Sequence, residues 1–176
     1  MNTRLTTLAS FAVALLGAPL ASADVNVKLT DVHLCCNSCV KGVDKAIAPV
    51  SGAAAKSDKD SETVTITAPD KATAQKAVDA LVAAGYFGKS SDAGIKVNAS
   101  TGATAAKVNS LNVSGVHLCC NKCVTVVKEA LSKVPGVKGS TAKKDAPTFE
   151  VTGDFKPTDV FNALQDVGLT GKAKAE

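Results

Sequence analysis

Cysteine and histidine are rare in this chain of 176 residues, and they occur in two short segments. All six cysteines and both histidines lie within residues 32–40 and 116–124, which read V-H-L-C-C-N-S-C-V and V-H-L-C-C-N-K-C-V. The two segments differ at a single position. Thiolate sulfur and imidazole nitrogen are ligands that zinc and softer ions such as copper(I) prefer. The pattern therefore predicts metal binding.

Each segment offers one imidazole and three thiols. The candidate ligands are His33, Cys35, Cys36 and Cys39 in the first segment, and His117, Cys119, Cys120 and Cys123 in the second. Three thiolates with one imidazole form a tetrahedral zinc composition, whereas two or three thiolates alone also suit copper(I). We expect one ion per segment, either copper(I) or zinc, with mercury as a further soft candidate.

The two segments belong to an internal repeat in which the second copy follows the first by 84 residues. Hydrophobic periodicity in the first copy predicts a strand, a helix, a hairpin and a second helix, at residues 25–29, 37–48, 53–67 and 70–84, and a short last strand that begins at 86–87. The second copy repeats this order, with its last strand at Leu169. The order βαββαβ is typical of a ferredoxin-like unit, in which two helices pack on one face of a four-stranded antiparallel sheet. The predicted fold class is α+β, with two tandem units.

The beginning of the chain predicts a signal peptide. Arg4 precedes an apolar run from Leu8 to Leu16, and Ala21-Ser22-Ala23 supplies small residues for cleavage after Ala23. The apolar run is shorter than the roughly 20 residues that a membrane-spanning helix needs. We therefore expect a periplasmic or secreted protein with no stable membrane insertion after cleavage.

The expected domain organisation follows from the leader and the repeat. A signal peptide at 1–23 precedes one domain at 24–89 and a second at 108–176. Residues 90–107 are rich in serine, glycine, alanine and threonine, a composition typical of a flexible linker.

Composition argues against several other functions. The net charge is only +4, and the chain has one tyrosine, five phenylalanines and no tryptophan, so a nucleic-acid surface with stacking aromatics is not expected. The only methionine is Met1, which excludes thioether ligands from the mature chain. No Ser/His/Asp set, paired carboxylates or phosphate-binding loop is present in the sequence. We expect a protein that is not an enzyme.

The predicted elements place each cysteine cluster in the loop after a first strand and in the first turn of a helix. Cysteines three residues apart in that turn lie on the same side, so their two sulfurs can converge on one ion. Free backbone N–H groups and the positive end of the helix dipole also favour anions there. We therefore expect depressed pKa values for four thiols, those of Cys36, Cys39, Cys120 and Cys123.

A C-x-x-C pair at a helix start, within a βαββαβ unit of this length, resembles the heavy-metal-associated (HMA) domain family, here in two tandem copies. That family includes small metallochaperones, periplasmic mercury-binding proteins and amino-terminal domains of metal-transporting P-type ATPases. Its members carry G-M-T-C-x-x-C, and the resemblance implies metal-binding pairs at Cys36 with Cys39 and at Cys120 with Cys123. It also implies a metal-transporting protein or a metallochaperone as partner.

The chain departs from the family motif and carries H-x-C-C-x-x-C instead. Leu34 and Leu118 stand where the family has methionine, and Cys35 and Cys119 stand where it has threonine. The adjacent cysteines resemble the C-C-x-x-E variant of plant zinc-transporting ATPases, which favours zinc, whereas the family as a whole favours copper.

Two other functions remain open for the cysteines. C-x-x-C at a helix start also serves thiol–disulfide redox proteins, and disulfides could staple a partner-binding module. Three thiols in each copy leave one without a partner, which argues against a disulfide framework. The sequence therefore favours an exported metal-binding protein with one ion per domain, for capture, buffering or transfer.

Overall fold

The computed structural model describes residues 24–174, so the predicted signal peptide lies outside the described residues. The first half contains β1 (Val25–Thr30), α1 (Asn37–Ile47), β2 (Ala54–Asp58), β3 (Thr63–Ala68), α2 (Lys71–Ala83) and β4 (Lys89–Ser90). The second contains β5 (Val108–Ser114), α3 (Asn121–Ser132), β6 (Val137–Ser140), β7 (Thr148–Phe155), α4 (Pro157–Gln165) and β8 (Lys172–Ala173). The predicted order βαββαβ is found in each half.

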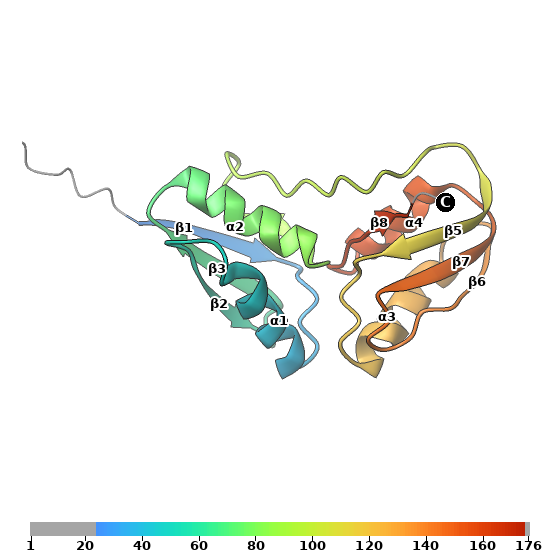
Figure 1. The fold of residues 1–176 in the computed structure, drawn as a ribbon, viewed down its shortest axis with the longest axis horizontal. Helices are drawn as coiled ribbons and strands as arrows, with labels where there is room; N and C mark the ends of the chain where they lie inside the picture. The colour runs from blue at the N-terminus through green and yellow to red at the C-terminus, as the bar shows by residue number, and fades with distance from the viewer. Residues whose placement is uncertain (1–23, 175–176) are drawn as a thin grey trace, which may run out of the picture.

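Each half forms a four-stranded antiparallel sheet, with strand order β2-β3-β1-β4 in the first and β6-β7-β5-β8 in the second. Helices α1 and α2 contact each other and the strands of their sheet, and α3 and α4 also pack together. Figure 1 shows the halves side by side, with the loops that follow β1 and β5 facing each other in the centre. The loops that carry the cysteines therefore meet at the boundary between the halves.

Local sequence explains how the first helix is held. In β1, Val27 and Leu29 are buried while Lys28 between them is exposed, as expected for a strand with one face on the core. In α1 the buried residues Cys39, Val43 and Ile47 recur every four positions. Cys39 is thus the first residue of the apolar stripe, and its backbone is fixed by the same packing that holds the helix.

The last strands lie a few residues further along the chain than Tyr86-Phe87 and Leu169, where the sequence predicts that they begin. The strands that pair with β1 and β5 are β4 and β8, further along the chain. Tyr86 instead forms an antiparallel bridge with Leu169 of the other half. The Phe87 N–H donates to the Gly168 carbonyl and the Thr170 N–H to the Gly85 carbonyl, each at 3.0 Å. These apolar residues pair across the boundary and not within their own sheets.

Two glycines allow the halves to approach closely at this bridge. Gly85 and Gly168 end the segments after α2 and α4 with φ angles of 89° and 74°, a region that favours glycine. A Cβ at Gly168 would collide with the backbone of residues 31–33, and one at Gly85 with the backbone of residues 115–117. The His33 N–H donates to the Gly168 carbonyl at 3.2 Å. Each glycine therefore lies directly against the loop that leads to the other half's cysteines.

The segment between the halves, residues 91–107, contains no helix or strand but is attached at several points. Gln75 on α2 accepts from the Lys96 N–H at 2.8 Å and donates to its carbonyl at 2.7 Å. Ile95 is buried in the core, and the Ala173 N–H donates to the Thr101 carbonyl at 2.7 Å. The linker thus contacts both halves, and its flexibility stays a prediction. Among residues 24–174, no helix is both long enough and apolar enough to cross a membrane.

We expect Gly168→Ala to destabilise the chain more than Gly102→Ala. Both glycines have positive φ, at 74° and 68°, so each alanine carries a backbone cost of about 1–2 kcal/mol. The nearest atom to a Cβ at Gly102 is 4.0 Å away, whereas at Gly168 the backbone of the opposite loop must move. Urea unfolding of the reduced chain should show a free energy of unfolding for Gly168→Ala that is lower by about a further 2 kcal/mol. Equal losses in the two variants would contradict the close approach of the halves.

Candidate metal centre

The cysteines lie where the sequence predicts, in the loop after the first strand and the first turn of the following helix. Cys36 and Cys120 are the N-cap residues of α1 and α3, with extended backbones at φ −164° and −153°. Cys39 and Cys123 follow in the first turn and are buried, whereas the other four cysteines are half-buried. Each half thus contributes two half-buried cysteines and one buried cysteine.

Sulfurs from the two halves contact one another across the boundary. The Cys35 Sγ lies 3.4 Å from the Cys120 Sγ and 3.5 Å from the Cys123 Sγ. The Cys119 Sγ of the second half makes the equivalent contacts with the first half. It lies 3.5 Å from the Cys39 Sγ and 3.9 Å from the Cys36 Sγ. The first cysteine of each C-C pair therefore contacts the C-x-x-C pair of the other half, and it also contacts the last cysteine of its own half, at 3.7 Å in each case.

These contacts define two mixed triads of sulfurs. The first mixed triad is Cys36, Cys39 and Cys119, with sulfurs 3.5–3.9 Å apart. The second mixed triad is Cys35, Cys120 and Cys123, with sulfurs 3.4–3.6 Å apart. The two triads are themselves in contact, since the Cys39 and Cys123 sulfurs are 3.9 Å apart. All six sulfurs form one continuous cluster.

The spacing of the sulfurs suits ligands that share an ion. With a metal–sulfur bond of about 2.3 Å, sulfurs on one ion are separated by about 3.8 Å in a tetrahedron and about 4.0 Å in a trigonal plane. A disulfide requires about 2.05 Å. All six cysteines are free, and several groups of three ligand atoms within 4.8 Å of one another include them. The cluster can therefore accept soft ions with small movements of the side chains.

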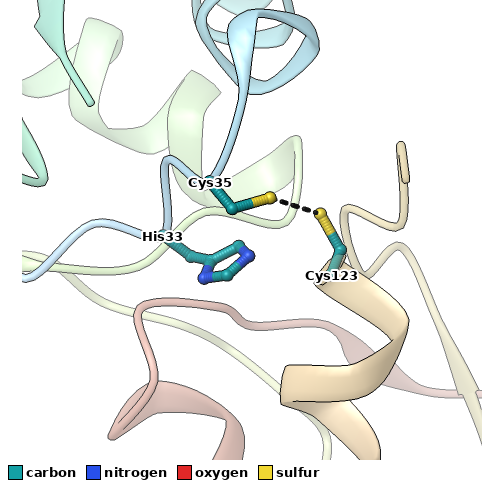
Figure 2. A group of neighbouring side chains, drawn as sticks. All are labelled: His33, Cys35 and Cys123. Atoms are coloured by element: carbon teal, nitrogen blue, oxygen red, sulfur yellow. Dashed lines mark hydrogen bonds between the residues drawn. The ribbon is translucent and has the colours of Figure 1, made fainter. Parts of the chain in front are cut away.

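His33 lies beside the second mixed triad. It is only 6% exposed, and its Nε2 has no hydrogen-bond partner among residues 24–174. Its ligand nitrogen and the sulfurs of Cys35 and Cys123 all lie within 4.8 Å of one another. Figure 2 shows Cys35 and Cys123 pointing toward each other with the His33 ring next to them. Burial lowers the pKa of His33, which favours the neutral imidazole that binds metal.

His117 is held differently. Its ring stacks on Tyr86 with the centroids 4.5 Å apart, and its Nε2 lies 3.0 Å from the Tyr86 hydroxyl. That hydroxyl donates to the Cys39 carbonyl at 2.7 Å, so the His117 Nε2–H is the donor to the tyrosine oxygen. Burial raises the pKa of Tyr86 and keeps the phenol protonated for this role. His117 is thus a neighbour of the first mixed triad whose Nε2 is already engaged.

The pKa values of the thiols in the cluster are shifted in different directions, some raised and some lowered. The pKa of Cys39 is well below its usual value because the Cys123 thiol donates to its sulfur. Burial acts to raise the pKa of Cys120, but the Cys123 N–H and neighbouring thiols lower it to about 7. Burial raises the pKa values of Cys35 and Cys119.

The expected depression of the Cys123 pKa is wrong. Its pKa is raised because it shares a proton with the Cys39 sulfur, which carries the negative charge. The helix dipole that the sequence predicts acts within each half, whereas the neighbouring sulfur that reverses its effect belongs to the other half.

Sequence reasoning missed Tyr86 and Gly42. A Cβ at Gly42 would overlap the Tyr86 hydroxyl and come within 2.7 Å of the His117 Cε1, so the absent side chain makes room for the stacked pair. The equivalent positions in the second copy are Val126 and Leu169. The signal in the sequence that could have found them is that the two copies of the repeat carry different residues at these positions.

Comparison with known proteins gives no family by sequence: no protein-family model and no curated protein matches the chain. Among solved structures, the N-terminal soluble domains of Bacillus subtilis CopA match at 18% identity over 88% of this chain and 97% of that chain, with a TM-score of 0.32. A structure described as "Crosstalk between Cu(I) and Zn(II) homeostasis" matches at 21% identity over 38% of this chain and 100% of that chain, with a TM-score of 0.33. TM-scores at this level do not establish a family.

We expect one thiol of the metal-free chain to ionise near neutral pH. Cys120, with a pKa of about 7, is a thiol below that pH and a thiolate above it. The ultraviolet absorbance of thiolate should therefore rise in a step near pH 7 that is lost in Cys120→Ser. Cys119→Ser is the matched control and should keep the step, because burial raises the pKa of Cys119. A step that survives in Cys120→Ser would refute this assignment.

Proposed function

We propose that the chain is an exported, non-enzymatic protein that captures copper(I), zinc or mercury at a six-cysteine centre shared by two ferredoxin-like domains of the HMA type. The observation that supports this most directly is the single cluster of six free sulfurs, 3.4–3.9 Å apart, drawn from both halves. The βαββαβ order of each half and the C-x-x-C pairs at the helix starts support the domain type.

The ligands of each ion come from both halves. In this proposal one ion is held by the first mixed triad and one by the second, so the chain carries two ions. This keeps the number expected from the sequence, one per domain, but changes the ligand sets. Three thiolates hold a soft ion more firmly than the two of a single C-x-x-C pair, which suits capture and buffering.

Transfer would begin at the half-buried sulfurs. Cys39 and Cys123 are buried, whereas Cys36 and Cys120 are half-buried at the helix starts. A thiolate of a metal-transporting protein or a metallochaperone can approach an ion on that side and enter as Cys36 or Cys120 leaves. Stepwise exchange of this kind never leaves the ion without sulfur ligands.

A pair of triple variants distinguishes shared from separate sites. In a Cys120→Ser/Cys123→Ser background, the first half keeps Cys35, Cys36 and Cys39. Adding Cys119→Ser removes the third sulfur of the first mixed triad and should weaken copper(I) binding by about tenfold or more. Adding Cys35→Ser instead removes the last sulfur of the second mixed triad, which the background has already disrupted. This change should alter the copper(I) affinity little. The measurement is competition with a copper(I) chelator, without air.

The opposite ranking of these two variants would mean that each half binds its ion with its own three cysteines. Failure of the unmodified chain to bind metal at all, with its thiols recovered as disulfides, would refute metal binding and favour the redox or structural functions of the cysteines.

The proposed export predicts the residue at which the mature protein begins. If the leader is cleaved after Ala23, the protein recovered from outside the cytoplasm begins at Asp24. Intact-mass measurement of secreted or periplasmic material checks this. Recovery of the chain with Met1–Ala23 attached, in the cytoplasm alone, would contradict export.

A further inference from the structure

The two histidines of the repeat are not equivalent in the structure. The Nε2 of His117 is engaged by the Tyr86 hydroxyl at 3.0 Å. Within the described part of the chain, the Nε2 of His33 has no hydrogen-bond partner, although His33 is more than nine-tenths buried. An unpaired buried nitrogen costs free energy unless something binds it. His33 is therefore the histidine of the centre whose Nε2 is available to bind an ion.

The difference has a cause in the sequence. Tyr86 and Gly42 act together on His117, the first as hydrogen-bond partner and the second by leaving room for it. The second copy has Leu169 where the first has Tyr86, and Val126 where it has Gly42. Leucine offers no polar atom, so the counterpart of the Tyr86 hydroxyl is absent from the side of His33.

The His33 ring lies beside sulfurs that could share an ion with one of its nitrogens. The His33 ligand nitrogen lies within 4.8 Å of the Cys35 and Cys123 sulfurs. The Cys120 sulfur is 3.4 Å from Cys35 and 3.6 Å from Cys123. One imidazole and three thiolates, two of them from the other half, are thus gathered at the second mixed triad. This composition is a recognised tetrahedral zinc site.

We propose that the two ions of the centre are of different kinds. His33 completes the second mixed triad as a four-ligand site for zinc(II), with Cys35, Cys120 and Cys123. The first mixed triad takes copper(I) with its three thiolates, because the groups of ligand atoms that lie within 4.8 Å of one another include His33 but not His117. This assignment rests on the proposed function and adds to it which ion each triad selects.

The second mixed triad lies next to a groove in the surface. The groove, of about 960 Å³, is lined by His33 and Cys35 and by charged groups of both signs, namely Asp31, Glu62, Asp166, Lys89 and Lys122. Lys89 pairs with Asp31 at 2.9 Å. The groove gives a route from solvent to the edge of this triad.

The test compares His33→Gln with His117→Gln in the mature chain, reduced and free of metal at the start. Each protein receives one equivalent of zinc, and X-ray absorption at the zinc edge measures imidazole scattering. We expect imidazole scattering in the unmodified chain and in His117→Gln, and its loss in His33→Gln. Chelator competition should show zinc affinity lowered about tenfold or more by His33→Gln. His117→Gln should change zinc affinity less than threefold.

Copper(I) affinity measures whether the His33→Gln centre is still formed, and we expect it to stay within threefold of the unmodified chain. Imidazole scattering that persists in His33→Gln, or equal zinc losses in the two variants, would overturn the proposal. Zinc bound by sulfur alone in the unmodified chain would overturn this inference and leave the proposed function intact. Binding of neither metal would refute the proposed function itself.

Discussion

The docking of the two halves at residues 85–87 and 168–170 is the constraint on which the centre depends. The two hydrogen bonds between these segments and the Tyr86–Leu169 bridge fix the loops that end at His33 and His117. Each loop leads within a few residues to an adjacent pair of cysteines. If the halves were apart, each would retain its own three cysteines, but the mixed triads would not exist.

Once the sulfurs are gathered, their charges oppose one another. Six thiols within contact distance of their neighbours cannot all ionise in a half-buried site, because like charges at that distance disfavour each other's ionised forms. This competition lowers the pKa of Cys39 and raises the pKa of Cys123. Cations remove it, since each ion replaces protons and is attracted by several thiolates. Metal binding would therefore tighten the contact between the halves.

Much of the fold could be predicted from hydrophobic periodicity, because each element has one face on its own half's core. The alternation in β1 and the four-residue repeat of Cys39, Val43 and Ile47 in α1 are local signals. The meeting of the cysteines could not be predicted in the same way. It depends on pairing between Tyr86 and Leu169, far apart in the sequence, and a linker rich in small residues gives no hint of how the halves dock. The unequal roles of His33 and His117 follow from Gly42 and Tyr86, which are unremarkable until they are seen beside the ring.

The central claim is that sulfurs of the two halves form one centre, and proximity labelling tests it most directly. A variant that keeps only Cys35 and Cys120 is treated, reduced and without metal, with dibromobimane, which becomes fluorescent when it bridges two thiols. With these sulfurs 3.4 Å apart, fluorescence should develop on the monomeric chain at a rate that does not depend on protein concentration. Fluorescence that appears only in cross-linked dimers, or not at all, would contradict the shared centre.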